Sequence, residues 1–141
     1  MASPEKIGKY HVIGVVGRGN MGTVYLAYDP FADQNVAIKV CKVPENQSEH
    51  DNRIASKLFF NETHIAANLE HPNIVQVLDA GEEDGLRYIV TEYVDGCDTL
   101  MNYRAPNQLL PIERTAEIVY VCANALDYVH RHGVIHRDIK P

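Results

Sequence analysis

A glycine-spaced turn between two β-alternating runs places the tightest constraint on how this chain folds. The pattern GxGxxG is formed by Gly17, Gly19 and Gly22. Residues 10–16 and 23–28 on either side are rich in β-branched and aromatic residues, which predicts a hairpin. A dinucleotide-binding turn requires a helix directly after the glycines, and a Walker A loop requires Lys-Ser or Lys-Thr where Thr23 stands. The turn is therefore either a plain glycine hairpin or a flap whose backbone N–H groups lie over phosphates.

The remaining sequence predicts an ordered series of strands and helices. Strands are expected at 10–16, 23–28, 35–41, 74–78 and 87–92, and helices at about 51–69 and 112–132. Gly96 suits a linker where the chain changes from strands to helices. The second helix is apolar around most of its circumference, ends in a C-cap pattern at Gly133, and is followed by only nine residues. We therefore expect the domain to continue beyond Pro141.

The composition excludes several classes of protein. With 141 residues, 45% of them hydrophobic, and a net charge of −6, the chain resembles one soluble domain or part of one, and the charge favours neither nucleic acid nor an anionic membrane as a partner. No apolar run approaches the roughly 18 residues of a membrane span, and no signal peptide is visible. The cysteines Cys41, Cys97 and Cys122 form no CxxC pair, which predicts reduced thiols and a cytoplasmic location.

Two charged residues stand in apolar surroundings. Lys39 lies in the strand sequence VAIK, and Glu62 fills the gap in an apolar helical stripe made of Ile54, Leu58, Ile65 and Leu69. Because a buried charge is costly unless it is paired, an ion pair between Lys39 and Glu62 is predicted. Such a pair either aims the Lys39 ammonium at anionic oxygens under the glycine flap or is a structural salt bridge without a ligand.

The C-terminal sequence HRDIKP carries the third chemical feature. Asp138 lies on a short irregular segment after a buried helix, where a carboxylate can accept a proton from an incoming hydroxyl. His136 and Asp138 are also compatible with a solvated turn or with a metal group that includes His130 and His132, although no four-ligand spacing is complete.

Taken in this order, the motifs resemble those of eukaryotic-type protein kinases from about Tyr10 to Pro141. The matching residues are Gly17, Gly19, Gly22 and Val24 for GxGxxGxV, Val36–Lys39 for VAIK, Glu62 for the helix acid, and His136–Asp138 for HRD. Residues 71–96 look particularly like bacterial serine/threonine kinases. The resemblance implies an α+β fold, with a five-stranded antiparallel sheet plus one helix as the N-lobe, followed by the first, mainly helical part of a C-lobe. It assigns residues 1–9 to a linker, 10–94 to the N-lobe with its nucleotide site, and 95–141 to the incomplete C-lobe.

The resemblance also implies nucleotide contacts at individual residues. The three glycines would cover the phosphates, and Lys39, positioned by Glu62, would hold the α and β phosphates. The adenine and ribose contacts would come from Val24, Ala37, the gatekeeper Thr91, the backbone of Glu92 and Val94, and Asp98.

The implied chemistry is transfer of the ATP γ-phosphate to Ser or Thr of a protein substrate. Asp138 would be the catalytic base, Lys140 matches the serine/threonine pattern, and Arg137 suggests control through an activation loop. The family's Mg²⁺ ligands would lie beyond Pro141, so these 141 residues are expected to be inactive alone and to bind ATP weakly, with little dependence on Mg²⁺. The alternative is a non-catalytic module that binds a nucleotide or a partner.

Overall fold

The structure is a computed structural model that describes residues 4–19, 22–42, 48–96, 99–137 and 139–140. The chain forms two compact units. The first contains Met1–Asn68 and Gln76–Tyr93, and the second contains Leu69–Val75 and Val94–Pro141. The segment 69–75 thus belongs with the C-terminal part of the chain, although the chain on both sides of it belongs to the first unit.

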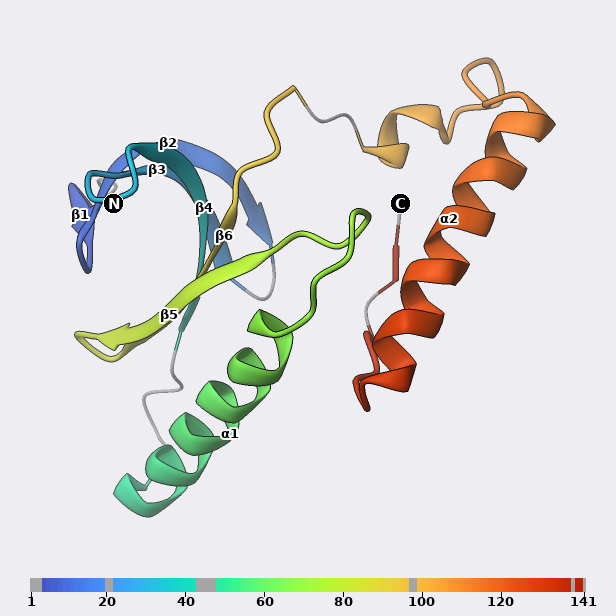
Figure 1. The fold of residues 1–141 in the computed structure, drawn as a ribbon. Coiled ribbons are helices and arrows are strands. Elements are labelled where there is room, and N and C mark those ends of the chain that lie inside the picture. Colours follow the sequence, from blue (N-terminus) through green and yellow to red (C-terminus); the bar gives the residue numbers. More distant parts are fainter. Residues whose placement is uncertain (1–3, 20–21, 43–47, 97–98, 138, 141) are drawn as a thin grey trace. The chain divides into compact units, whose positions relative to one another are not determined.

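The first unit is built on an antiparallel sheet of six strands in the order β1-β2-β3-β4-β6-β5. The strands are β1 (Lys6–Ile7), β2 (Tyr10–Gly19), β3 (Gly22–Asp29), β4 (Gln34–Lys42), β5 (Val77–Glu83) and β6 (Leu86–Glu92). The sheet is strongly curled (Figure 1). A sheet of this kind with one helix in the same unit agrees with the predicted α+β class.

Two features of the sheet differ from the sequence prediction. The two-residue strand β1 lies within the segment expected to be a linker and makes the sheet six-stranded instead of five-stranded. The strand predicted at 74–78 is wrong in position, because β5 runs from Val77 to Glu83. The acidic stretch between the strands predicted at 74–78 and 87–92 is mostly strand, and the turn there consists of Asp84 and Gly85, with φ of 51° and 71°. Positive φ at both positions is what a two-residue hairpin turn requires, and Asp-Gly favours it.

The core of the first unit lies on one face of the curled sheet. It consists of Ile7, Tyr10, Ala27, Val36, Ile38, Val40 and Val90. Within β4 the alternation is clear, since Val36, Ile38 and Val40 are buried, whereas Ala37 and Lys39 between them belong to the opposite face. The core cluster therefore occupies one face of β4 and leaves the other for different contacts.

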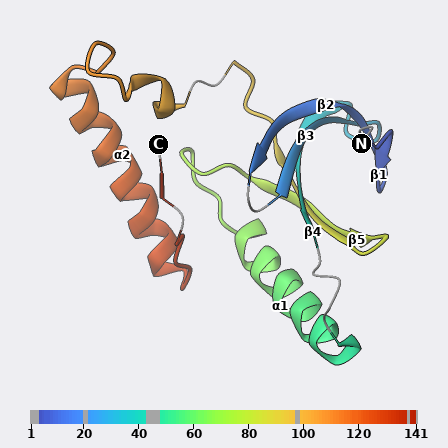
Figure 2. The same cartoon turned by 180° about the vertical axis from the view of Figure 1, so that it is seen from behind.

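Helix α1 (Glu49–Ala67) begins at a side-chain cap and contacts β5 (Figure 2). The Ser48 hydroxyl accepts a hydrogen bond from the Asp51 amide at 3.1 Å, and this satisfies an N–H group without a partner inside the helix. The predicted burial of the apolar stripe is wrong for Ile54, Leu58 and Ile65, which are between 45% and 57% exposed. It is confirmed for Leu69, which is 5% exposed and lies beyond the end of α1. Thr63 is the buried residue of α1.

The second unit contains a 3-10 helix, η1 (Leu100–Tyr103), and helix α2 (Ile112–Arg131). The C-cap predicted at Gly133 is confirmed. Gly133 has φ of 76°, its amide donates to the His130 carbonyl at 2.9 Å, and the Val134 amide donates to the Val129 carbonyl at 3.1 Å. These two bonds form a Schellman motif, which satisfies the last carbonyls of the helix.

Tyr128 connects α2 with the segment 69–75 in the second unit. Its hydroxyl accepts a hydrogen bond from the Glu70 amide at 3.1 Å, and its ring centroid lies 5.1 Å from that of His71 and 4.3 Å from that of His132. Much of α2 is nevertheless exposed, including Val119 and Tyr120. Among the described residues, no helix has the length and apolar character needed to cross a membrane.

Candidate functional site

The strand register brings Gly17, Val24 and Lys39 into one row across the sheet. Gly17 of β2 lies opposite Val24 of β3, Val24 lies opposite Lys39 of β4, and Lys39 lies opposite Ile89 of β6. Directly opposed residues in antiparallel strands place their side chains on the same face. The glycine turn and the lysine, 22 positions apart in the sequence, thus belong to one surface.

A second row lies two residues along the strands on the same face. Leu26 is opposite Ala37, Ala37 is opposite Thr91, and Thr91 is opposite Val77. The two rows together form a surface with an apolar part, contributed by Leu26 and Ala37, and a cationic end at Lys39. We call these two rows the Lys39 face.

The glycines of the turn have different structural roles. The sequence needs glycine at Gly22, where φ is 142° and an added Cβ would lie 2.0 Å from the Val40 carbonyl oxygen. At Gly17 and Gly19, by contrast, an added Cβ would meet nothing within 4 Å. Gly22 therefore fixes the end of the turn against β4, whereas Gly17 and Gly19 leave their backbone open to approach from outside.

Strand β2 carries two irregularities in its pairing before the glycine turn. The pairing with β3 shifts register between Val12 and Gly14 and again between Val15 and Gly17. Such bulges increase the local twist of a strand and redirect the residues that follow. Gly17 comes directly after the second shift, so the bend is placed at the start of the glycine turn.

The predicted burial and pairing of Lys39 are wrong. Lys39 and Glu62 are both exposed, and no ion pair joins them among the described residues. The first reason is that Lys39 lies on the face of β4 opposite the buried core. The second is that α1 buries Thr63, whereas Glu62, the residue before it, is exposed to solvent.

A polar clamp that the sequence did not reveal holds the first half of α1 to the sheet. Arg87 of β6 is only 9% exposed, and its Nε donates to Glu82 Oε2 of β5 at 3.2 Å. Its Nη2 donates to the backbone and side-chain oxygens of Asn52 and, at 3.0 Å, to the Ser56 hydroxyl. One guanidinium therefore links two strands and the helix. The available signal was a lone Arg in an otherwise β-branched and aromatic run, but its partners lie 31 and 35 residues away.

The clamp also changes the acidity of Glu82. The Ser56 hydroxyl donates to Glu82 Oε2 at 2.7 Å, and this bond, assisted by the bond and charge of Arg87, lowers the pKa of Glu82 below its usual value. Both partners favour the ionised carboxylate. The clamp, defined as Asn52, Ser56, Glu82 and Arg87, is therefore a charged network at neutral pH.

The second half of α1 is less closely attached. A cavity of about 430 Å³ lies between the helix and β5, lined by residues that include Phe60, Thr63, Ala67, Val77 and Ala80. At the last turn the side-chain amide of Gln76 donates to the Ala67 carbonyl at 2.9 Å. Helix α1 is thus held by polar contacts near both ends, with open space beside its C-terminal half.

The remaining predicted site residues are only partly placed. The Glu92 amide donates to the Gln76 carbonyl at 3.0 Å, while the Glu92 carbonyl accepts from the Thr91 hydroxyl at 3.2 Å. Val94 and Lys140 are exposed and belong to the second unit. Asp98 and Asp138 lie outside the described residues. The structure thus brings Gly17, Val24, Ala37, Lys39 and Thr91 together on one face of the first unit.

Arg137 in the HRD sequence has an unusual backbone. Its φ is 61°, in the left-handed region that residues other than glycine rarely adopt. Such conformations cost free energy and cluster at functional sites. The sequence identified Arg137 by its motif but gave no signal of this backbone state.

The comparison with known families decides the identity of this fold. Residues 10–141 match the family model of the protein kinase domain. The chain belongs to the protein kinase domain family. This confirms the resemblance inferred from the motifs and the fold class inferred with it, a kinase N-lobe with the start of a C-lobe.

Its relatives include several bacterial serine/threonine kinases. It is 40% identical to serine/threonine-protein kinase PrkC of Bacillus subtilis over 134 residues, which is 95% of this chain and 20% of the relative. It is 42% identical to the probable serine/threonine-protein kinase PknB of Lactococcus lactis, over 94% of this chain and 21% of the relative. The chain thus spans about a fifth of the length of these kinases.

Solved structures show the same relationship. A crystal structure of the Mycobacterium tuberculosis PknI kinase domain superposes with a TM-score of 0.81 at 37% sequence identity. The superposition covers 99% of this chain and 55% of the PknI chain. The family model, the relatives and the solved structures thus all place the chain among protein kinase domains, and the relatives named above are bacterial serine/threonine kinases.

Proposed function

We propose that the chain is the ATP-binding part of a kinase that transfers the γ-phosphate of ATP to Ser or Thr of proteins. The observation that carries the proposal is the row of Gly17, Val24 and Lys39 on one face of the sheet. It places an exposed ammonium group beside open glycine backbone, which is the donor set that phosphate oxygens require.

Successive parts of the Lys39 face suit the phosphates and the adenine ring of ATP. The Lys39 ammonium and the amides of the open turn suit the phosphates, while Val24 and Ala37 offer apolar area for the adenine ring. Thr91 and the carbonyl of Glu92 lie at the end of β6, where the hydrogen-bonding edge of a base would be read. We assign Val94 and Asp98 the remaining adenine and ribose contacts on the strength of the family pattern.

Glu62 acts in this proposal only after α1 moves. Glu62 is exposed and α1 is held by the clamp and by Gln76, so pairing with Lys39 requires the helix to turn or shift toward the sheet. The space beside the C-terminal half of α1 leaves room for such a movement. A Glu62–Lys39 pair would then fix the ammonium for the α and β phosphates.

The transfer step uses residues of the second unit. Asp138 would accept the proton of the Ser or Thr hydroxyl as that oxygen attacks, and Lys140 would contact the transferred phosphate. Mg²⁺, when bound, neutralises the phosphate charge. Since the chain covers 55% of a solved kinase domain, we assign the Mg²⁺ ligands and the transfer activity to a longer protein. We place the kinase part in the cytoplasm, with ATP and a protein substrate as partners.

The proposal is tested by titrating the chain with a fluorescent ATP analogue carrying a methylanthraniloyl group. Lys39→Ala is expected to weaken binding about ten- to a hundredfold, because hydrogen bonds to charged groups are worth about 1.5–3 kcal/mol. Lys57→Ala, which removes an exposed lysine from α1, serves as the matched control and is expected to bind like the wild type. Binding is expected to change little when EDTA replaces Mg²⁺. Equal affinities of Lys39→Ala and wild type would remove the ATP site from this face.

A second experiment separates catalysis from binding alone. In the longer protein, Asp138→Asn is expected to abolish phosphate transfer to a protein substrate and to retain ATP binding. If the longer wild-type protein binds ATP and transfers nothing, the chain belongs to a non-catalytic nucleotide-binding module instead.

A further inference from the structure

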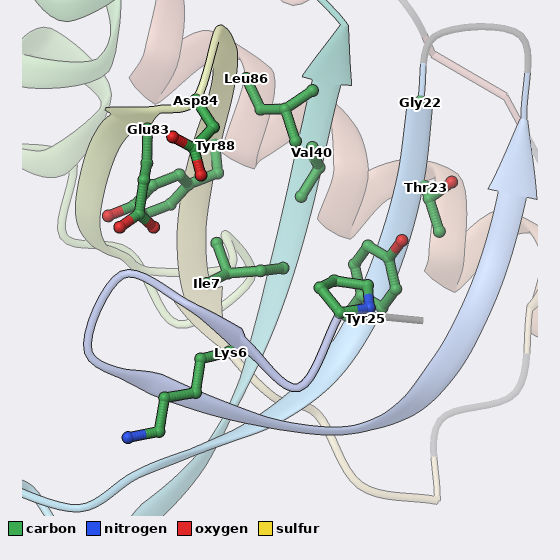
Figure 3. Close-up of a pocket in the computed structure, with 11 residues that line it drawn as sticks. Lys6, Ile7, Gly22, Thr23, Tyr25, Val40, Glu83, Asp84, Leu86 and Tyr88 are labelled. Carbon is green, nitrogen blue, oxygen red and sulfur yellow. The ribbon is translucent and has the colours of Figure 1, made fainter. Parts of the chain in front are cut away.

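A cavity of about 450 Å³ lies in the first unit, on the face of the sheet opposite the Lys39 face (Figure 3). Its walls are mainly apolar and come from four strands: Ile7 of β1, Tyr25 of β3, Val40 of β4, and Leu86 and Tyr88 of β6. Ile7 and Val40 belong to the core cluster, and Tyr25 and Tyr88 pack against it. The volume falls within the range of about 300–1,000 Å³ that is typical of small-molecule sites.

Two glycines leave the space that the Tyr88 ring of this cavity wall occupies. A Cβ at Gly81 would lie 2.3 Å from Tyr88 Cζ, and one at Gly8 would lie 2.4 Å from the Tyr88 hydroxyl oxygen. The ring therefore occupies space that any other residue at either position would fill. Burial raises the pKa of the Tyr88 hydroxyl further above neutral, so this wall offers a hydroxyl that can donate a hydrogen bond.

The mouth of the cavity is acidic. Glu83 and Asp84, which form the end of β5 and the start of the turn, place their carboxylates beside Tyr88, whereas the Lys6 ammonium points away from them (Figure 3). Glu83 Oε2 accepts the Gly8 amide at 2.7 Å, which fixes that side chain at the mouth. An apolar interior with two carboxylates at its opening complements a molecule that is apolar at one end and cationic at the other.

The cavity shares strand segments with the Lys39 face. Gly22 and Val40 both line it, and they touch, since the Gly22 backbone lies against the Val40 carbonyl. Val40 directly follows Lys39, and Thr23, another lining residue, directly precedes Val24. A molecule in the cavity would therefore contact, from behind, the two strand segments that carry the predicted phosphate-binding residues.

We propose that this cavity binds a small amine with an apolar body and that its occupation changes the affinity of the Lys39 face for ATP. The inference of amine binding depends on the cavity alone, whereas the effect on ATP affinity rests on the proposed function. The contact between Gly22 and Val40 would couple the two sites, because a ligand in the cavity would either shift this contact or stabilise it. Coupling of two ligands through such an element is reciprocal.

The site is tested by isothermal titration calorimetry of the 141-residue chain with 1-naphthylmethylamine. Saturable binding with one site is expected. Leu86→Trp, which fills the cavity from its rim, is expected to weaken binding at least tenfold. Leu78→Trp is the matched control, because Leu78 is 43% exposed against 40% for Leu86 and does not line this cavity. Equal affinity in Leu86→Trp and wild type, or the absence of saturable binding, would overturn the site.

Two further measurements keep the proposal testable if Leu86→Trp does not fold. Asp84→Asn is expected to weaken the amine about two- to fivefold, as for an exposed ion pair, and Asn also tolerates the φ of 51° at this position. 1-Naphthalenemethanol, which lacks the charge, is expected to bind wild type and Asp84→Asn equally. An unchanged amine affinity in Asp84→Asn contradicts the acidic mouth.

The coupling is tested by repeating the ATP titration with the amine at saturation. An ATP affinity shifted at least threefold is expected, and an unchanged ATP affinity would overturn the coupling while leaving the cavity site intact. If ATP does not bind under either condition, the proposed function fails and the amine titration still decides the cavity.

Discussion

The two faces of strand β4 differ in burial and in predicted role. Val36, Ile38 and Val40 are buried in the core cluster, whereas Ala37 and Lys39 lie on the face that carries the predicted ATP contacts. The five residues alternate along one strand, so the same backbone serves stability on one side and ligand contact on the other. The comparison teaches that substitutions one position apart should have effects of different kinds.

The same contrast applies to helix α1. Its apolar residues Ile54, Leu58 and Ile65 are exposed, and the helix is attached through the polar clamp of Asn52, Ser56, Glu82 and Arg87. The sheet is stabilised by apolar burial, and the helix by a buried guanidinium. Helix α1 should therefore loosen without unfolding of the sheet.

The largest expected effect is a loss of stability from the buried side of β4. Ile38 has 0% exposure, and Ile38→Ala is expected to lower the free energy of unfolding by about 2–5 kcal/mol, because it removes buried methyl groups and leaves a cavity. Lys39→Ala, one position away on the exposed side, is expected to change it by less than about 0.5 kcal/mol. Urea denaturation followed by far-UV circular dichroism measures both. Similar losses in the two variants would show that the two faces do not differ as described.

A smaller effect is expected from breaking the clamp. Arg87→Met is expected to cost about 1–3 kcal/mol, because it removes hydrogen bonds to a charged group and leaves Glu82 and Asn52 without this donor. Amide hydrogen exchange should become faster in α1 and stay unchanged in β3 and β4. Arg53→Met, which changes an exposed arginine on α1, is the control and should leave exchange unaltered. Equal acceleration in the sheet and the helix would contradict a separate attachment of α1.

The smallest expected effect is the contribution of the same clamp to the pH dependence of the free energy of unfolding. The Ser56 hydroxyl and Arg87 lower the pKa of Glu82 in the folded state below its ordinary value of 4.5. The stabilisation is therefore complete above pH 4.5 and is lost as the pH falls through the lowered pKa. Glu82→Gln should show a shallower loss of unfolding free energy below pH 4.5 than wild type. If the unfolding free energy of the two proteins fell in parallel with pH, Glu82 would not contribute to the pH dependence.

The features that the sequence predicted correctly are those with a local signal. The hairpin around the glycine turn, the C-cap at Gly133 and the kinase motifs each depend on residues close together in the chain. The rows that join Gly17, Val24 and Lys39 follow from those strands once their pairing is known. This part of the candidate site was accessible because alternation fixes which residues share a face.

The features that the sequence missed or misplaced depend on tertiary contacts. Strand β1 has two residues, too few for any periodicity, and β5 was misplaced because acidic residues at a sheet edge look like a turn. The Lys39–Glu62 pair was inferred from expected burial, but α1 turns Thr63 inward. The role of Arg87 has no local signal, because its partners on α1 are 31 and 35 residues away in the sequence.

The most direct test of the account is a map of amide chemical-shift changes in the ¹⁵N-labelled chain when ATP is added. The expected result is that the largest changes occur at Gly17, Gly19, Val24, Lys39 and Thr91, with smaller changes at Leu86 and Tyr88 in the cavity wall. The central claim is that the Lys39 face, which carries none of the core cluster, binds the nucleotide. Changes concentrated at the cavity wall, or spread evenly over the sheet, would contradict that claim.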